Sequence, residues 1–393
     1  MKPLLWLLTL LAFVVAGSWW KLGGCFSEAQ GGRGPQPSRG LLASNLQQLL
    51  AASSAQIGEY DIALLDLLCA EGLPGAEAMN PQDCIATLDG WAERVRSETE
   101  RNLHRYRANP REFDSSEAYF RMLMMAVVVY EDFSVRYNPE RISSPGAVDP
   151  NDHFFADSRD IFLHGLLQPT LNHQPSTLNL RFGTCSSMPV LYIAIGRRLG
   201  YPLKLVTTKS HLFLRWEGAG ERFNLEATGK GMNRYDDKHF KQWPFPVTEE
   251  EIQADGYLKS LTPVEELALF FSLRGHCLKD AGRMSEAVTS YTAAVRLVPA
   301  ARPYCLLLAA AQQERARPGS SAGVPPASAA GVSPAIGPPP AYPQASPLLP
   351  PPPLGMGAAP AEEAVAFPSS TGPQPATVNQ PPDPNPLLKI RQR

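Results

Sequence analysis

The sequence has no excess of charge of either sign. Lys and Arg number 36 and Asp and Glu number 38, for a formal net charge of -2. A protein that binds nucleic acid mainly through phosphate contacts needs a concentrated basic surface. We therefore expect no nucleic-acid partner.

Paired cysteines are also missing. The six cysteines lie far apart and form no CxxC motif, at positions 25, 69, 84, 185, 277 and 305. A zinc ribbon or a small disulfide scaffold would need closely spaced cysteines. His153, His164 and His173 are not spaced with carboxylates as a ligand set, and we interpret them as solvated loop histidines. The sequence predicts neither a metal nor another cofactor.

Charge is absent from residues 3–20, an apolar run at the lower length limit for spanning a bilayer. Residues 1–26 are therefore expected to be a cleaved signal peptide or an uncleaved membrane anchor, and the two tryptophans that end the run favour the anchor. Cys25 has only a loose lipoprotein-type spacing, which makes lipidation the lesser alternative. Residues 27–40 form a Gly/Ser/Pro-rich linker. We expect a membrane-anchored or exported protein whose body lies outside the cytoplasm.

Proline, in contrast, is abundant at the other end. Residues 318–386 hold 21 of the 39 prolines. Such a tract has few amide donors and few large apolar side chains, so it does not form a packed core. We predict a disordered tail over 317–393, with an alternative role as a PxxP ligand for an aromatic groove.

The body of the chain begins with helices. Residues 41–138 show apolar positions at three- and four-residue spacing, which indicates a helical N-terminal region. One long helix is expected from Cys84 to about Tyr106 and a more buried one from Ser115 to Tyr130. Met124 and Met125 are expected to fill the core rather than line a site.

Residues 139–261 have a different pattern. After a polar connection, an apolar helix is expected from Met188 to Leu199, stopped by Gly200. A turn at 217–220 then separates two of three strands. The strands are expected at residues 203–208, 211–216 and 222–227.

Residues 262–316 match one 34-residue tetratricopeptide repeat, in which small residues let two helices cross closely. Counting backward from Pro299 as position 32, six further residues fall at the expected repeat positions: Phe271, Gly275, Leu278, Ala287, Tyr291 and Ala294. A solenoid needs about three repeats to stand alone. We therefore expect this unit to pack on the preceding region, and we place a peptide-binding role second.

Candidate chemistry begins with Cys185. It is expected at the N-terminus of a helix over 185–199, behind Gly183 and Thr184. Free N–H groups and the positive end of the helix dipole favour a thiolate there, and the same N–H groups help to stabilise an oxyanion. A free cysteine is also commonly a small buried apolar residue, so position alone does not decide its role.

His211 and Glu226 form the second part of the candidate site. With the hairpin midpoint between Gly218 and Ala219, Leu212 faces Leu225 and Leu214 faces Phe223. His211 is then directly opposite Glu226, close enough for the carboxylate to hold the imidazole. The alternative is a histidine that begins a strand and pairs with a surface glutamate, with no catalytic role.

These residues carry a resemblance to a known family. Three segments, Gly183-Thr184-Cys185, Ser210-His211-Leu212 and Glu226-Ala227-Thr228, resemble the signatures of the transglutaminase-like superfamily of papain-like cysteine enzymes. The helices before this region and the single repeat after it resemble a bacterial branch that joins such a core to tetratricopeptide repeats. The implied fold class is α+β, with the helix that carries the cysteine packed on antiparallel strands, N-terminal helices and a C-terminal helical hairpin.

The resemblance also implies roles. Cys185 is the nucleophile, His211 is the general base and acid, and Glu226 orients the imidazole at a position where the family more usually has Asp. If Glu226 does not orient the imidazole, Asn224 is the second candidate for that role. Two upstream residues, Gln174 and Asn179, are candidates for the second oxyanion donor, and neither is assigned.

Because the family includes transamidases, peptidases, deamidases and inactive members, fold is easier to predict than reaction. The sequence predicts a membrane-tethered cysteine acyl-transfer enzyme, either a protease or amidase or a transamidase, acting on a protein or peptide. The alternative is a non-catalytic scaffold for protein interactions.

Overall fold

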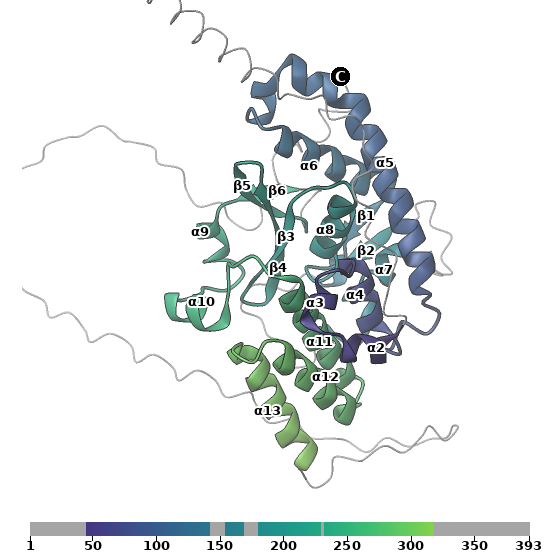
Figure 1. Ribbon diagram of the computed structural model, residues 1–393, viewed down its shortest axis with the longest axis vertical. Helices are drawn as coiled ribbons and strands as arrows, with labels where there is room; N and C mark the ends of the chain where they lie inside the picture. Colours follow the sequence, from purple (N-terminus) through teal and green to yellow (C-terminus); the bar gives the residue numbers. More distant parts are fainter. Residues whose placement is uncertain (1–44, 142–153, 169–179, 229–231, 318–393) are drawn as a thin grey trace, which may run out of the picture. The chain divides into compact units, whose positions relative to one another are not determined.

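The computed structural model describes residues 45–141, 154–168, 180–228 and 232–317 (Figure 1). These residues form helices and a four-stranded antiparallel sheet, which confirms the α+β class. The expected signal peptide or anchor, the linker and the residues after 317 lie outside the described part. Within that part, no helix is long and apolar enough to cross a membrane.

The N-terminal region is helical, as predicted. Its helices are α2 (Leu46–Ala51), α3 (Ser54–Ile57), α4 (Ile62–Ala70), α5 (Pro81–Ala108) and α6 (Glu117–Val127), with a 3-10 turn η1 (Pro110–Phe113) and a π turn η2 (Val128–Asp132). Asn80 caps α5 by accepting from the Gln82 N–H, and Pro81 occupies its first position. Met124 and Met125 are buried in the core, as predicted.

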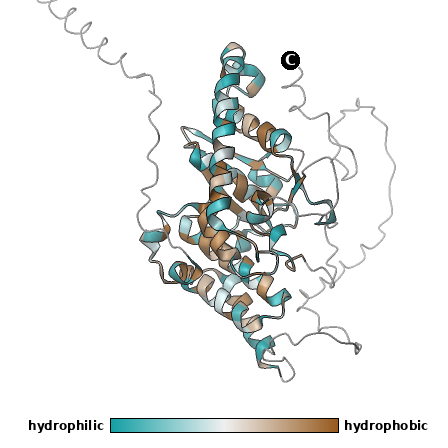
Figure 2. Cartoon of the chain, turned by 90° about the vertical axis from the view of Figure 1, so that its right-hand side faces the viewer, coloured by the Kyte–Doolittle hydropathy of each residue, from teal (hydrophilic) through white to brown (hydrophobic). Residues whose placement is uncertain are grey.

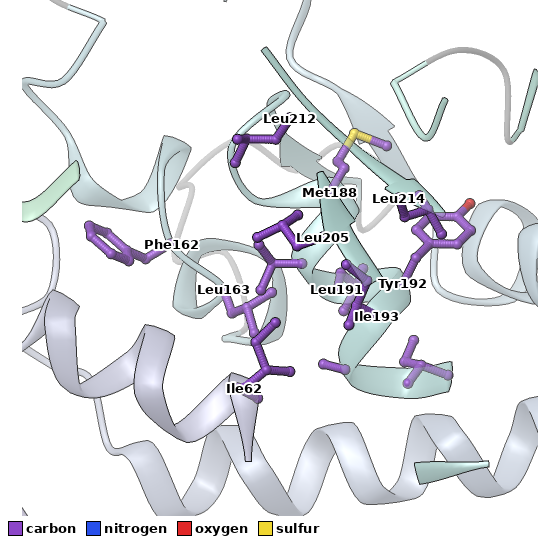
Figure 3. Close-up of a cluster of buried hydrophobic side chains, with 14 of the residues drawn as sticks. Ile62, Phe162, Leu163, Met188, Leu191, Tyr192, Ile193, Leu205, Leu212 and Leu214 are labelled. Atoms are coloured by element: carbon purple, nitrogen blue, oxygen red, sulfur yellow. The ribbon is translucent and has the colours of Figure 1, made fainter. Parts of the chain in front are cut away.

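Helix α8 (Met188–Arg198) is the centre of the packing. Every residue from Met188 to Gly196 is buried, which suits a helix that is apolar on all sides. It contacts strands β3 (Leu203–Thr208) and β4 (His211–Gly218) as well as α4 and α5, and it lies between the sheet and α5 in Figure 1. Figure 3 shows its side chains among those of the strands, and Figure 2 shows hydrophobic residues gathered on the inner helices. Gly200, with a φ of +76°, follows the helix end where expected.

The sheet has one apolar and one mixed face. Its strands lie in the order β3, β4, β5 (Glu221–Glu226) and β6 (Asn233–Tyr235), all antiparallel. Alternate residues of β4 such as Leu212 and Leu214 enter the main core, while His211 and Arg215 point to the other face, where Phe213 packs with Val206 and Phe240. The three predicted strands are confirmed within two residues, whereas β6 was not predicted. A separate parallel pair joins β1 (Val135–Tyr137) to β2 (Arg181–Gly183).

The predicted hairpin register is wrong by two residues. Leu214 pairs with Leu225 and Trp216 pairs with Phe223, because the turn consists of Ala219 and Gly220. Both turn residues have positive φ, of 54° and 80°, as a two-residue hairpin with the right twist requires.

Gly218 was expected to be part of the turn between the two strands, but it has a different role. It ends β4, where a Cβ would come within 2.7 Å of Pro202, so its missing side chain permits a close approach rather than a turn.

Helices return at the C-terminal end of the described part. They are α9 (Asp237–Phe240), α10 (Glu249–Asp255), α11 (Pro263–Asp280), α12 (Met284–Leu297) and α13 (Arg302–Ala316). Helices α11 and α12 pack closely, because Gly275 leaves room for Tyr291: a Cβ there would lie 2.4 Å from the tyrosine ring. Arg197 of α8 forms an ion pair with the fully buried Glu266 of α11, which ties this unit to the core.

Candidate active site

Cys185 lies in the turn before α8. The helix begins at Met188, where the apolar run predicted it, with Ser187 as its N-cap; the expectation that Cys185 itself opens the helix is wrong by three residues. The Met188 N–H nevertheless donates to the Thr184 carbonyl at 3.0 Å, which continues the helical bonding pattern into this turn. The Cys185 side chain is partly exposed, and the Cys185 N–H has no hydrogen-bond partner among the residues that the structure describes.

The cysteine turn is fixed to a neighbouring loop. Thr184 Oγ1 donates to the Asp160 carbonyl at 2.6 Å, and it accepts from the Ser186 N–H at 3.2 Å. Asp160 ends the 3-10 turn η4 (Ser158–Asp160), and its carboxylate accepts from Asn138 at 3.0 Å and from Arg141 at 2.9 Å. The backbone around Cys185 is thus set before any ligand arrives, as electrostatic stabilisation of a reacting group requires.

The expected contact between His211 and Glu226 is present. The imidazole Nε2 lies 2.6 Å from Glu226 Oε2, and both side chains are buried. Glu226 Oε1 accepts from the N–H of Thr228 at 2.9 Å and from its hydroxyl at 2.6 Å. Both carboxylate oxygens therefore have donors, and the orientation of the carboxylate is fixed by its own loop.

The surroundings favour a charged imidazole at His211. Burial lowers its pKa, but the Glu226 carboxylate and the Cys185 side chain raise it by more, to about 10. Because Nε2 is engaged by Glu226, Nδ1 is the ring nitrogen left for Cys185. The imidazole thus interacts with both a carboxylate and a thiol, the two partners that the base of an activated nucleophile has.

Asn224 is not a reserve for Glu226. Its Nδ2 donates to Asp237 Oδ1 at 2.7 Å, and its Oδ1 accepts from Arg215 Nε at 2.7 Å. Arg215, with 1% exposure, also donates to Asp237. The role predicted for Asn224 is therefore wrong: it belongs to a buried polar network that joins the sheet to α9.

Sequence reasoning missed two aromatic residues at the site. Tyr137 pairs with Gly183 across the β1–β2 ladder, which brings it next to the cysteine turn. Burial raises the pKa of Tyr137, and the charges of Cys185 and Glu226 raise it further. The Trp243 ring meets His211 edge-on, with 4.6 Å between ring centroids. Neither residue belongs to a motif, and both are distant from the site along the chain.

Other residues that the sequence singled out have no place in this arrangement. Gln174 and Asn179, the candidates for a second oxyanion donor, lie outside the described residues, as do His153 and His173.

His164 was expected to be a solvated loop histidine, and this is wrong. It is fully buried in α7 (His164–Leu167), with Nε2 at 3.2 Å from Ser158 Oγ. Burial lowers its pKa to about 4. Over the described ranges, no group of three His, Cys, Asp or Glu side chains is arranged to hold a metal ion.

Comparisons with models of protein families, with curated proteins and with solved structures gave no match for this chain.

Proposed function

We propose that this chain is a transglutaminase-like cysteine acyl-transfer enzyme with Cys185 as nucleophile, His211 as general base and acid, and Glu226 as the orienting carboxylate. One observation carries the proposal. The buried imidazole of His211 contacts Glu226 at 2.6 Å and interacts with the Cys185 side chain on the same ring. The three residues come from three different elements, and this convergence is what a nucleophile, base and orienting group require.

The roles define a two-step reaction. The Cys185 thiolate attacks a carboxamide or peptide carbonyl, and the Cys185 N–H is positioned to donate to the oxyanion. As the C–N bond breaks, the His211 imidazolium gives its Nδ1 proton to the departing amine and leaves a thioester. Water or a second amine then gives a proton to Nδ1 and attacks the thioester, which releases the thiolate again. Water makes the enzyme a protease or amidase, and an amine makes it a transamidase.

The rest of the chain has proposed roles as well. We assign residues 139–261 to a papain-like core that acts on a protein or peptide substrate, and α11 with α12 to one tetratricopeptide repeat. Support for the repeat comes from the close contact of Gly275 with Tyr291 and from the burial of the other matching helix positions. The repeat serves first as structural support and second as a site for a peptide partner. The N-terminal segment tethers the enzyme to the membrane or exports it, with the body outside the cytoplasm.

The test follows alkylation of Cys185 by iodoacetamide against pH, with mass spectrometry reporting modification at that residue. An imidazolium beside the thiol favours the thiolate, so wild type is expected to react fast at neutral pH. In His211→Ala the rate at pH 7 falls by about tenfold or more, with the profile displaced to higher pH.

His104→Ala is the matched control, because His104 is an exposed histidine on α5. It is expected to leave the profile of Cys185 unchanged. Identical profiles for wild type and His211→Ala would refute the proposed enzyme and favour the alternative, a non-catalytic interaction scaffold with the same core and repeat.

A further inference from the structure

A row of aromatic rings extends from His211 toward the surface. Trp243 meets His211 at 4.6 Å between ring centroids, and His239 lies 5.6 Å from Trp243. Tyr235 stacks on His239 at 3.9 Å, with ring planes 11° apart. We call Tyr235, His239 and Trp243 the aromatic row. It begins on β6, continues on α9 and ends in the turn that follows, where the Trp243 N–H donates to the His239 carbonyl.

The outer end of the row is open to solvent. Tyr235 is 37% exposed, and Leu306 is the other large hydrophobic side chain exposed in the described part of the chain. The β5–β6 ladder pairs Tyr235 with Asn224, so Tyr235 shares the sheet face that carries Glu226. His239 and Trp243 are half-buried, so the row forms a continuous ring surface from the exposed Tyr235 to His211, and aromatic side chains of this kind commonly line ligand sites.

The base of the row is rigid. Phe240 of α9 stacks on Phe213 of β4 with centroids 3.8 Å apart and planes within 4°. Asp237 of α9 accepts hydrogen bonds from the buried Arg215 and from Asn224, both at 2.7 Å. These contacts hold α9 on the sheet, so the ring surface exists before a ligand binds, which lowers the entropy cost of binding.

We propose that the aromatic row is a specificity subsite that binds an apolar, preferably aromatic, side chain of the peptide substrate next to His211. That the substrate is a peptide rests on the proposed function. Ring stacking at 4.5–7 Å is a favourable arrangement for one more aromatic group. Burial lowers the pKa of His239 by more than the Glu226 carboxylate raises it, so the row is neutral at pH 7 and offers no charge to an ionic ligand.

The experiment compares two reagents on the full chain. The chloromethyl ketones of N-acetylphenylalanine and N-acetylalanine carry the same reactive group and differ only in the side chain beside it. The readout is the ratio of their rate constants for alkylation of Cys185, followed at that residue by mass spectrometry. Wild type is expected to prefer the phenylalanine reagent. Tyr235→Ala lowers the ratio about fivefold, as loss of one aromatic pair predicts.

Two control variants test whether a change in the ratio of rate constants is specific to the ring of Tyr235. Tyr235→Phe keeps the ring and is expected to keep the preference. Leu306→Ala removes the other exposed apolar side chain, on α13, and is expected to change nothing. Equal ratios for wild type and Tyr235→Ala would overturn the subsite. Protection of Cys185 by N-acetylglucosamine oligomers but not by N-acetylphenylalaninamide would overturn it too, in favour of a sugar ring on the same surface.

Failure of the subsite is separable from failure of the proposed function. The ratio divides out the reactivity of the thiol, because both reagents attack the same sulfur. The iodoacetamide profile of wild type and His211→Ala reports on thiol activation alone. An activated thiol with no side-chain preference contradicts the subsite only, and an inactive thiol with a clear preference contradicts the catalytic proposal only.

Discussion

Asp66 offers the sharpest test of the electrostatics of the fold. It lies in α4 with no exposed surface, and its Oδ1 accepts from the Leu163 N–H at 2.8 Å. Its Oδ2 has no hydrogen-bond partner within the described residues. Burial raises the pKa of Asp66 to about 8, against the lowering effect of the Leu163 hydrogen bond. The side chain is therefore neutral in the folded protein at pH 7.

The sign of the pH effect follows from proton binding. Between the unfolded pKa of 3.8 and the folded value of about 8, the folded state keeps a proton that the unfolded state has released. The free energy of unfolding therefore falls as pH rises through this window and levels off above it. A window of about four pH units at about 1.4 kcal/mol per unit gives a loss on the order of 6 kcal/mol.

Two histidines act in the opposite direction. Burial lowers the pKa of His164 and of His276 to about 4, so each favours the folded state increasingly as pH rises from 4 to 6.5. The pH dependence of wild type alone therefore hides the effect of Asp66. The difference between wild type and Asp66→Asn isolates it, because both proteins carry the two histidines.

The assay is urea unfolding of wild type and Asp66→Asn between pH 5 and 8.5. Asn keeps the acceptor for Leu163 and the shape of the neutral acid, so the two proteins are expected to match only below about pH 4, and at pH 5 the variant is already more stable by about 2 kcal/mol. The variant becomes more stable by several kcal/mol toward pH 8.5. Asp89→Asn, the same chemical change on the exposed side of α5, controls for general loss of a carboxylate. Parallel stability curves for wild type and Asp66→Asn would refute the reasoning.

Three further substitutions test separate parts of the structure. Glu226→Asp shortens the side chain by one methylene and breaks the 2.6 Å contact, so the pKa of His211, followed by NMR titration, is expected to fall from about 10 toward 6.5; an unchanged titration contradicts this. Gly275→Ala places a methyl group 2.4 Å from the ring of Tyr291, and we expect it to lower the free energy of unfolding in urea by about 2 kcal/mol. An unchanged free energy of unfolding would mean that the Tyr291 ring moves aside without cost. Arg215→Met takes the Nε donor from the buried Asn224 Oδ1 and one of the two donors from Asp237 Oδ1, and it is expected to cost about 3 kcal/mol in the same assay. Wild-type stability would mean that these hydrogen bonds do not stabilise the fold.

Helices were predictable where the apolar period was long. The stripe of α5 and the all-apolar character of α8 appear directly in the sequence, and burial in the structure follows both patterns. The π turn after α6 carries no such signal, because it depends on how Val128–Asp132 meet their neighbours. The apolar run placed the start of α8 correctly at Met188, but the turn that carries Cys185 was wrongly included in the helix, since Thr184 and Ser187 bond to a loop that is distant along the chain.

The aromatic residues at the site could not be predicted from the sequence, for a similar reason. Tyr137 approaches Cys185 only because β1 pairs with β2, and Trp243 approaches His211 only because Asp237 and Phe240 hold α9 on the sheet. Each contact depends on pairings between distant segments. Local spacing contains no information about such pairings.

The hairpin register explains how a glutamate at position 226 reaches His211. Hydrophobic alternation fixes which face a residue occupies, and a shift of the pairing by two residues leaves every face unchanged. His211 and Glu226 were therefore placed on the correct face from a register that was wrong. In the actual register, continued one step beyond Leu214 and Leu225, Glu226 is opposite Phe213, so His211 is its diagonal neighbour. Diagonal positions are about 7 Å apart, against about 5 Å for direct partners. The additional methylene of glutamate spans this longer separation, and two hydrogen bonds from Thr228 hold the carboxylate in position.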